Sequence, residues 1–486
     1  MNENNSISNK LIINKKDKLN YIDIIIFLFS FFALSTALIA FFPGIVTSDT
    51  VVQWSQMDNN VYNSWHPIFH TLLQKLFRTI WNSPAIICIV QITCLALLLT
   101  AFCKITRDNE KKFGVICIQI LVCCIICFFP INLMYSVSLW KDILYSFSLL
   151  CLMFYIYKGI KKDFKYTKFE YIFIDITLVF ISLLRYNGIV VSLIILSFIL
   201  IYSIVKKQFI HYLKILGLFV IIFILFKTPE LLVKKNYDNM RYKQGVYIHI
   251  TSALLKHNRI NNEEDLNFLD NILDVDFWRN RYNPYTHDSL MFSTDQQIDD
   301  KFLQKNSTQF KSMVIKYSVK NLDVVIHHYI KLTSSLWNPI PSNDPEYYSY
   351  LCSTKSNEGN IYTKDEKPLS NTLNHIIEKS VNFIYNSKLL NKTIYRPSIY
   401  LYISLIIILI ICKIKKNKKY ILLITPMILN FVSLLPALPS QDFRYSYINL
   451  LTFCVLQIIL LTSFAKTLYK QKKEKRMNLR GDKFEI

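Results

Sequence analysis

Residues 21–42 read YIDIIIFLFSFFALSTALIAFF, an almost unbroken apolar run of the length that a membrane-crossing helix requires. About 20 apolar residues cross a hydrocarbon core roughly 30 Å thick, and backbone polar groups in lipid must be satisfied within the segment. The run is longer than the apolar core of a signal peptide, and no small-residue cleavage site follows it. It therefore predicts a retained, helical first membrane span.

Nine further segments share this apolar character, and hydrophobic residues make up 52% of the 486-residue chain. We therefore predict an all-α polytopic membrane protein with about ten transmembrane helices. Only 8 residues are glycine, and neither a GxGxxG nor a Walker loop is present, which argues against a nucleotide-driven pump. The predicted spans are residues 21–42, 84–103, 113–131, 143–158, 171–184, 189–205, 213–228, 397–412, 420–437 and 446–465.

Basic side chains are concentrated in alternate connecting segments. Six of these segments together carry +20 of the formal net charge of +22, whereas the segments between them are close to neutral. Because basic loops stay on the cytoplasmic side, both termini are predicted to be cytoplasmic, and the basicity reflects topology rather than nucleic-acid binding. The basic segments are residues 1–20, 104–112, 158–170, 206–214, 413–419 and 466–486.

This alternation predicts a multi-pass protein of the cell membrane. It divides the chain into two membrane modules with one large exterior segment between them. Apolar residues at three- and four-residue spacing predict that the exterior segment is a mainly helical domain. The predicted parts are a cytoplasmic tail (1–20), an N-terminal module of about seven spans (21–228) with a first exterior loop (43–84), an exterior domain (229–396), a C-terminal module of three spans (397–465) and a basic cytoplasmic tail (466–486).

Polar side chains first gather after the first span, where residues 43–73 read PGIVTSDTVVQWSQMDNNVYNSWHPIFHTLL. Asp49 lies at a depth where a carboxylate can act as general base on an acceptor hydroxyl or amine. The alternative is a helix N-cap, since Ser or Asp before VVQW suits that position. His66 and His70 have the spacing of a metal pair, but Pro67 places His66 outside the helix and no third ligand stands nearby. We therefore favour substrate contact or interfacial packing over a metal site.

Two further groups of candidates flank predicted spans on the same exterior side. Lys141 and Asp142 follow a tryptophan at the start of the fourth span, where they suit either a lipid phosphate or an aromatic belt with a snorkelling lysine. The span 171–184 covers only about 21 Å at 1.5 Å per residue. The turn that carries Arg185 and Asn187 should therefore lie at or below the membrane surface, where an arginine needs a partner or an anionic ligand.

The last exterior loop adds Asp442 and Arg444, a carboxylate and a second arginine for phosphate contact. All of these candidates fall on the same predicted side of the membrane. A carboxylate surrounded by cations at a membrane face suits a substrate in which a sugar is joined to a lipid through phosphate. The cations would hold the phosphate leaving group, and the carboxylate would activate an acceptor.

Seven short motifs carry a resemblance to a known family: SDTVVQWSQ, NSWHPIFHTLL, LWKDILYS, LLRYNG, YNPYTHD, SLWNP and DFRYSY. With the layout of spans over residues 20–465, they resemble the GT-C superfamily of lipid-dependent membrane glycosyltransferases, and within it an uncharacterised bacterial multi-pass family. The resemblance implies a polyprenyl-phosphate sugar donor, a cell-envelope glycan or other acceptor, and Asp49 as the catalytic acid of the first loop. Many members carry two adjacent acids there, whereas this chain has one, so a divalent metal stays an open alternative that is not favoured, and no other cofactor is indicated.

Other functions remain open at this stage. A glycan polymerase or ligase has the same architecture, and a transporter or flippase of a lipid-linked or envelope precursor is the alternative from a different class. Transporters usually carry ionisable groups at mid-membrane and internal repeats. Here the intramembrane acids Asp23 and Asp175 lie near the inner ends of their spans and no repeat is visible, which favours the enzyme over the transporter. A catalytically silent binding protein is the third possibility.

Overall fold

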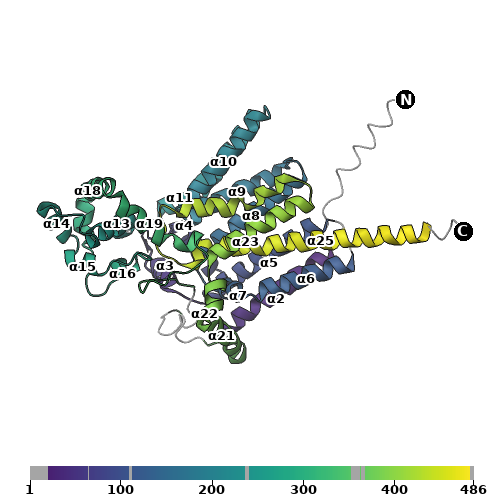
Figure 1. Ribbon diagram of the computed structural model, residues 1–486, viewed down its shortest axis with the longest axis horizontal. Coiled ribbons are helices and arrows are strands. Elements are labelled where there is room, and N and C mark those ends of the chain that lie inside the picture. Colours follow the sequence, from purple (N-terminus) through teal and green to yellow (C-terminus); the bar gives the residue numbers. More distant parts are fainter. Residues whose placement is uncertain are drawn as a thin grey trace.

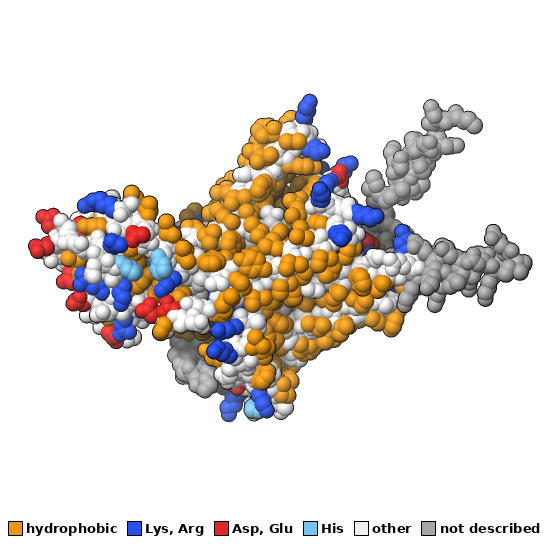
Figure 2. All heavy atoms as spheres, in the orientation of Figure 1, with side chains coloured by type: hydrophobic (Ala, Val, Ile, Leu, Met, Phe, Trp, Pro, Cys, Tyr) orange, Lys and Arg blue, Asp and Glu red, His pale blue; other side chains and the backbone are white. Residues whose placement is uncertain are grey.

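The computed structural model describes residues 20–63, 65–108, 112–235, 240–351, 362 and 367–481. The predicted N-terminal tail lies almost wholly outside these residues. Figure 1 shows a bundle of long helices with a smaller helical lobe at one end. Figure 2 shows apolar side chains covering the visible face of the bundle, whereas Lys, Arg, Asp and Glu gather on the lobe and at the opposite end. An apolar belt between two charged ends is the surface that a membrane-spanning bundle requires.

The bundle consists of α2 (Tyr21–Ala40), α5 (Ala85–Arg107), α6 (Phe113–Cys127), α7 (Pro130–Ser136), α8 (Lys141–Lys161), α9 (Lys168–Leu184), α10 (Gly188–Val205), α11 (Phe209–Leu232), α23 (Pro397–Ile414), α24 (Thr425–Leu434) and α25 (Tyr447–Gly481), with 3-10 helices η1 (Lys418–Ile424) and η2 (Phe443–Ser446). Seven helices in the described residues are long and apolar enough to cross a membrane, or eight if the bent pair α6–α7 is one span. The all-α polytopic class is thus confirmed.

The count of ten spans stays a prediction. Helix α9 has 17 residues, and the predicted span 420–437 is divided between η1 and the ten-residue α24. A ten-residue helix is about 15 Å long, half of a hydrocarbon core. Hydropathy alone does not distinguish such a broken segment from one continuous span, because it averages over residues without regard to where the helix is interrupted.

The predicted third span, 113–131, is not straight. Helix α6 ends at Cys127, and α7 starts at Pro130 with a bend of 69° between the two helices. Proline is favoured at the first position of a helix and lacks the N–H that would continue the preceding one. The bend brings the chain after α7 beside the first loop, where Ile45 donates its N–H to the carbonyl of Val137 at 2.8 Å.

The segment 229–396 contains two packing units. The lobe, which we define as α12–α19, encloses its own core around Leu254, Trp278 and Phe310. By contrast, Ile377 and Val381 of α21 belong to the core of the bundle. The elements of the segment are α12 (Met240–Lys243), α13 (Gly245–Lys256), α14 (Glu263–Asp270), α15 (Val275–Asn280), α16 (Asp288–Met291), α17 (Asp300–Lys305), α18 (Ser307–Lys320), α19 (Leu322–Leu332), α20 (Ser334–Trp337), α21 (Asn371–Asn386) and α22 (Lys388–Ile394).

The first loop connects the bundle to the lobe. It forms α3 (Ser48–Asn59), β1 (Val61–Tyr62) and α4 (Ile68–Arg78), and β1 pairs in parallel with β2 (Lys234–Lys235). The ring of Trp65 stacks on Tyr242 of α12 with 4.4 Å between ring centroids. On the other side, the N–H of His287 donates to the carbonyl of Pro439 at 2.9 Å. The lobe is therefore joined to the two loops that carry Asp49 and Asp442.

Candidate functional site

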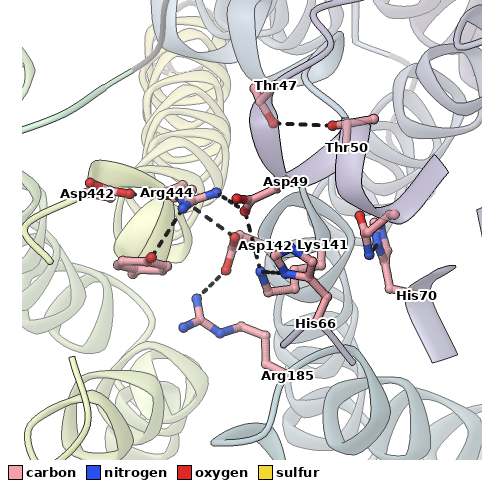
Figure 3. Close-up of polar contacts among 12 residues, drawn as sticks. Thr47, Asp49, Thr50, His66, His70, Lys141, Asp142, Arg185, Asp442 and Arg444 are labelled. Atoms are coloured by element: carbon pink, nitrogen blue, oxygen red, sulfur yellow. Dashed lines mark hydrogen bonds and ion pairs between the residues drawn. The ribbon is translucent and has the colours of Figure 1, made fainter. Parts of the chain in front are cut away.

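Seven of the predicted site residues meet at the lobe-facing end of the bundle, and we call them the Asp49 cluster (Figure 3). They come from α3, the loop before α4, the start of α8, the turn between α9 and α10, and the loop and η2 before α25. The members are Asp49, His66, Lys141, Asp142, Arg185, Asp442 and Arg444. Asn187 lies at the edge of the cluster, and His70 lies apart from it.

Backbone pairing explains why the first loop and α8 meet. Ile45 forms an isolated parallel bridge with Ser138, which fixes the chain just before α3 beside the chain just before α8. Asp49 is the second residue of α3, and the N-cap is Thr47, so the interpretation of Asp49 as the cap is wrong. Its carboxylate turns to the cluster instead, where Oδ2 lies 3.7 Å from Nζ of Lys141.

Arg444 is the centre of the cluster. Its Nη1 donates to Oδ2 of Asp49 at 2.7 Å, and its Nε donates to Oδ2 of Asp442 at 3.1 Å. The same Nε lies 3.9 Å from Oδ2 of Asp142. One planar guanidinium therefore donates to two carboxylates from different N–H groups and lies near a third, a fixed geometry that a lysine could not reproduce. The guanidinium also lies 4.8 Å from the ring centroid of Trp140.

Arg185 has the partner that its depth requires. It is hydrogen-bonded to Asp142, whose side chain is fully buried, and its Nε donates to Oδ1 of Asn187 at 3.0 Å. Asn187 in turn donates to Oγ of Ser433 on α24 at 2.8 Å. Gly188 allows the tight turn, because a Cβ there would lie 1.8 Å from the carbonyl oxygen of Ile181. The turn therefore holds Arg185 against the start of α8.

The electrostatics separate two carboxyl groups of the cluster. Burial raises the pKa of Asp49, but the positive charges of Arg444 and Lys141 outweigh it and hold the pKa well below its usual range. For Asp442 the balance is reversed: burial raises its pKa to about 6, and the neighbouring Arg444 only partly opposes this. Asp49 is thus firmly ionised as the site stands, whereas Asp442 titrates nearer to neutral pH.

The two histidines of the first loop have different surroundings. His66 accepts from Nζ of Lys141 through Nδ1 at 3.2 Å, and burial lowers its pKa to about 3, so the ring is neutral. His70 is fully buried on α4 and contacts Gln53 and Gln74 instead, with 3.0 Å between its Nδ1 and Nε2 of Gln53. No group of three His, Cys, Asp or Glu side chains within the described ranges could hold a metal ion.

Two aromatic members of the site were missed at the level of sequence. Tyr445 lies between the two arginines, with its ring centroid 4.6 Å from the guanidinium carbon of Arg185 and 5.1 Å from that of Arg444. Trp140 stacks on Arg444 as described above. Trp140 precedes Lys141 in LWKDILYS, and Tyr445 follows Arg444 in DFRYSY. An aromatic residue next to a charged candidate was therefore the signal in the sequence that could have identified them. Rings in these positions hold guanidinium planes without neutralising them.

The Asp49 cluster is largely buried, but three of its side chains keep some contact with solvent. The side chains of Asp49, Lys141 and Arg444 are 14%, 15% and 12% exposed, whereas that of Asp142 is fully buried. Nε2 of His66 and Oδ2 of Asp142 are buried without a hydrogen-bond partner among the residues that the structure describes. Two surface cavities, of ≈ 250 and ≈ 500 Å³, lie outside the cluster. Buried polar atoms without partners are rare in folded proteins, and at a polar cluster they suit an incoming ligand or water.

Comparison of the chain with protein-family models, curated proteins and solved structures found no match. The GT-C resemblance therefore stays a prediction, and the function must be argued from the geometry of the Asp49 cluster.

Proposed function

We propose that the protein is a membrane glycosyltransferase that moves a sugar from a polyprenyl-phosphate donor to a cell-envelope glycan or similar acceptor. The observation that carries this proposal is the meeting of Arg444, Lys141 and Asp49 at one end of an apolar bundle. A substrate with a long apolar tail and a phosphate head would place its tail along the bundle and its phosphate at these cations.

The cations of the cluster have the geometry and charge to bind a phosphate leaving group in addition to pairing with the carboxylates. A guanidinium binds phosphate oxygens through a planar fork, and lysine adds a mobile point charge. The guanidinium of Arg444 lies within 5.1 Å of the ring centroids of Trp140 and Tyr445, and its Nη2 donates to the hydroxyl of Tyr445 at 3.2 Å, so these two rings keep it in place when its charged partner changes. Charge that develops on the phosphate as the glycosidic bond breaks would be stabilised by donors already in place.

Asp49 would act as the base only after the phosphate has bound. With Arg444 and Lys141 as neighbours, its pKa is held too low for efficient proton abstraction near neutral pH. A donor phosphate that takes these two cations would relieve that effect and raise the basicity of the carboxylate. Asp49 would then accept the acceptor's hydroxyl proton. The acceptor oxygen bonds to the sugar's anomeric carbon, and the electrons of the breaking bond leave with the phosphate.

Asp442 is the second candidate for the base, because its raised pKa of about 6 already lies near the operating range. Its partner Arg444 is shared with Asp49, so the two carboxylates would respond to the same phosphate. The expected distinction is kinetic: replacement of the base removes turnover, and replacement of the other carboxylate changes mainly donor affinity.

The experiment starts with the protein purified in nanodiscs. Mass spectrometry of its lipid extract should detect a polyprenyl phosphate, and a transfer assay with the extracted lipid-linked sugar should give a glycan product. Asp49→Asn should lower turnover by about 10²–10⁴-fold, the usual contribution of a general base, with normal folding. The matched control is Asp58→Asn, because Asp58 lies on the same helix but pairs with Arg78, at 3.0 Å. Equal turnover by wild type and Asp49→Asn would refute Asp49 as the base.

A transporter or flippase is the second candidate function, and one observation favours it. Both carboxylate oxygens of Asp175 on α9 are buried and have no hydrogen-bond partner within the described part of the chain. Buried carboxylates within helix bundles often carry protons or ions. Movement of a fluorescent lipid-linked sugar across proteoliposomes, lost in Asp175→Asn and kept in Asp49→Asn, would support this candidate over the transferase.

A further inference from the structure

A second polar site lies outside the Asp49 cluster. It is a cavity of ≈ 250 Å³ between α22 and the segment 341–349, and we call it the α22 cavity. Lys388, Lys392 and Arg396 line it, together with Tyr347, Tyr385 and Ser349, and no Asp or Glu is among its lining residues. Figure 2 shows basic side chains gathered near the place that α22 occupies in Figure 1.

The three cations differ in how they are held. Arg396 is buried and fixed: Nε donates to the carbonyl of Asn338 at 2.8 Å, and Nη1 donates to the hydroxyl of Tyr347 at 2.7 Å. Lys388 and Lys392 stand four residues apart on α22, hence on one face of that helix. Neither lysine lies within 4 Å of a described carboxylate. The cavity therefore has one fixed charge and two charges that can turn towards a ligand.

The place of the cavity narrows the class of ligand. Arg396 directly precedes α23, one of the helices able to cross a membrane, so the cavity lies where the bundle ends. Phe383 on α21 and Leu389 on α22 are 67% and 72% exposed. Lysine, tyrosine and serine donors around a space of this size suit a phosphate with a small polar substituent. A lipid headgroup and a water-soluble sugar phosphate both offer that chemistry.

The wall of the α22 cavity continues into the Asp49 cluster. Tyr347 and Ser349 line the cavity, and the next residue, Tyr350, forms a parallel bridge with Asp442. The N–H of Phe443 donates to the carbonyl of Tyr350 at 2.9 Å. A ligand in the cavity would thus lie one short strand-like segment away from Asp442 and Arg444.

We propose that the α22 cavity is a second binding site, specific for a phosphate ester and separate from the Asp49 cluster. This assignment does not depend on the transferase proposal, because it concerns binding at different residues. Glycerol 1-phosphate is the soluble probe, and its binding to the full chain is measured by calorimetry in phosphatidylcholine nanodiscs.

The decisive variant is Lys388→Gln/Lys392→Gln, which should weaken binding of glycerol 1-phosphate at least about tenfold, since each charge-assisted contact is worth more than a neutral one. The matched control is Lys367→Gln/Lys379→Gln, which removes the same charge from exposed lysines that do not line the cavity. Ser349→Asp keeps both lysines and adds a negative charge, so it should weaken binding as well.

Nanodiscs that contain phosphatidylglycerol distinguish the two sources of the phosphate. If a lipid headgroup fills the cavity, the wild type should bind glycerol 1-phosphate more weakly there than in phosphatidylcholine. If the ligand is water-soluble, the affinity should be the same in both. Undetectable binding by the wild type, or an equal loss in the control pair, would overturn the proposal and reduce the lysines to general surface charge.

Discussion

Two buried ion-pair groups occupy opposite ends of helix α2 and its continuation, and they are built differently. At the start of α2, Asp23 is hydrogen-bonded to Arg107, whose Nη1 also donates to Oε1 of Gln119 at 3.0 Å. Nε2 of Gln119 donates hydrogen bonds to the hydroxyl of Thr106 and to the carbonyl of Cys103. The side chains of Asp23 and Arg107 are 2% and 3% exposed.

The Asp49 cluster lacks this completeness. Three carboxylates share Arg444, buried polar atoms of His66 and Asp142 have no hydrogen-bond partner in the described chain, and Asp49 keeps some exposure. A buried ion pair whose hydrogen bonds are all made joins helices to one another. A partly exposed group with unmade hydrogen bonds can exchange partners. Both groups contain an aspartate and an arginine, but the unmade hydrogen bonds and the exposure of the Asp49 cluster indicate that chemistry is to be expected there and not at Asp23.

The largest effect that would sharpen this comparison, after the loss of turnover in Asp49→Asn, concerns Asp23 and Arg107. Arg107→Met should leave the buried Asp23 with Lys104 alone, whose Nζ lies 3.8 Å from Oδ2, and should destabilise the protein by up to about 3–5 kcal/mol. Thermal unfolding in detergent measures the loss. Turnover per folded molecule should stay normal, and a specific loss of turnover with normal stability would give this pair a functional role.

The second test uses the pair of Arg185 and Asp142. Arg185→Gln alone should destabilise the protein by several kcal/mol, because the fully buried Asp142 would lose its hydrogen-bonded cation and keep only Arg444, 3.9 Å away. The double variant Arg185→Gln/Asp142→Asn should recover most of that stability. Its KM for the lipid-linked donor should stay raised, since the phosphate contact is still missing. Recovery of both stability and KM would make Arg185 a structural residue only.

A third, smaller effect is the pH dependence that Asp442 adds. Its pKa in the folded protein is raised to about 6, whereas the unfolded chain has the ordinary value near 3.8, so protons bind more tightly to the folded state. Stability should therefore fall by roughly 2–3 kcal/mol as pH rises from about 4 to about 6 and then stay level. Asp442→Asn should flatten this part of the profile in unfolding experiments at fixed salt. An unchanged profile would contradict the raised pKa.

The smallest effect is expected at His70. It lies outside the Asp49 cluster and contacts Gln53 and Gln74, so His70→Gln should cost about 1 kcal/mol of stability through the altered hydrogen bonds. Turnover and donor KM should change less than twofold. His66→Gln is the informative partner, because His66 touches Lys141 and its replacement should change donor affinity. A large kinetic effect of His70→Gln would mean that the cluster extends along α4.

The sequence by itself determined the class of the fold and most members of the site. Apolar runs predict helices wherever a segment must satisfy its own backbone in lipid, and this requirement is local. Charged residues beside such runs are costly unless they have a role, which identified Asp49, Lys141, Arg185 and Arg444 as candidates. Pro130 is a local signal that a helix is interrupted after α6, but the direction of the bend depends on how the neighbouring helices pack.

Only the tertiary structure decided which charges meet. Arg444 and Asp49 are 395 positions apart, and the hydrogen bond between Arg185 and Asp142 spans 43 positions. No local pattern carries such pairings, because the partner of a buried charge is fixed by how helices pack and by bridges such as Ile45 with Ser138. For the same reason the sequence did not separate His66 from His70, or α21 from the lobe. An amphipathic pattern shows that one face is buried, and packing alone decides against which core.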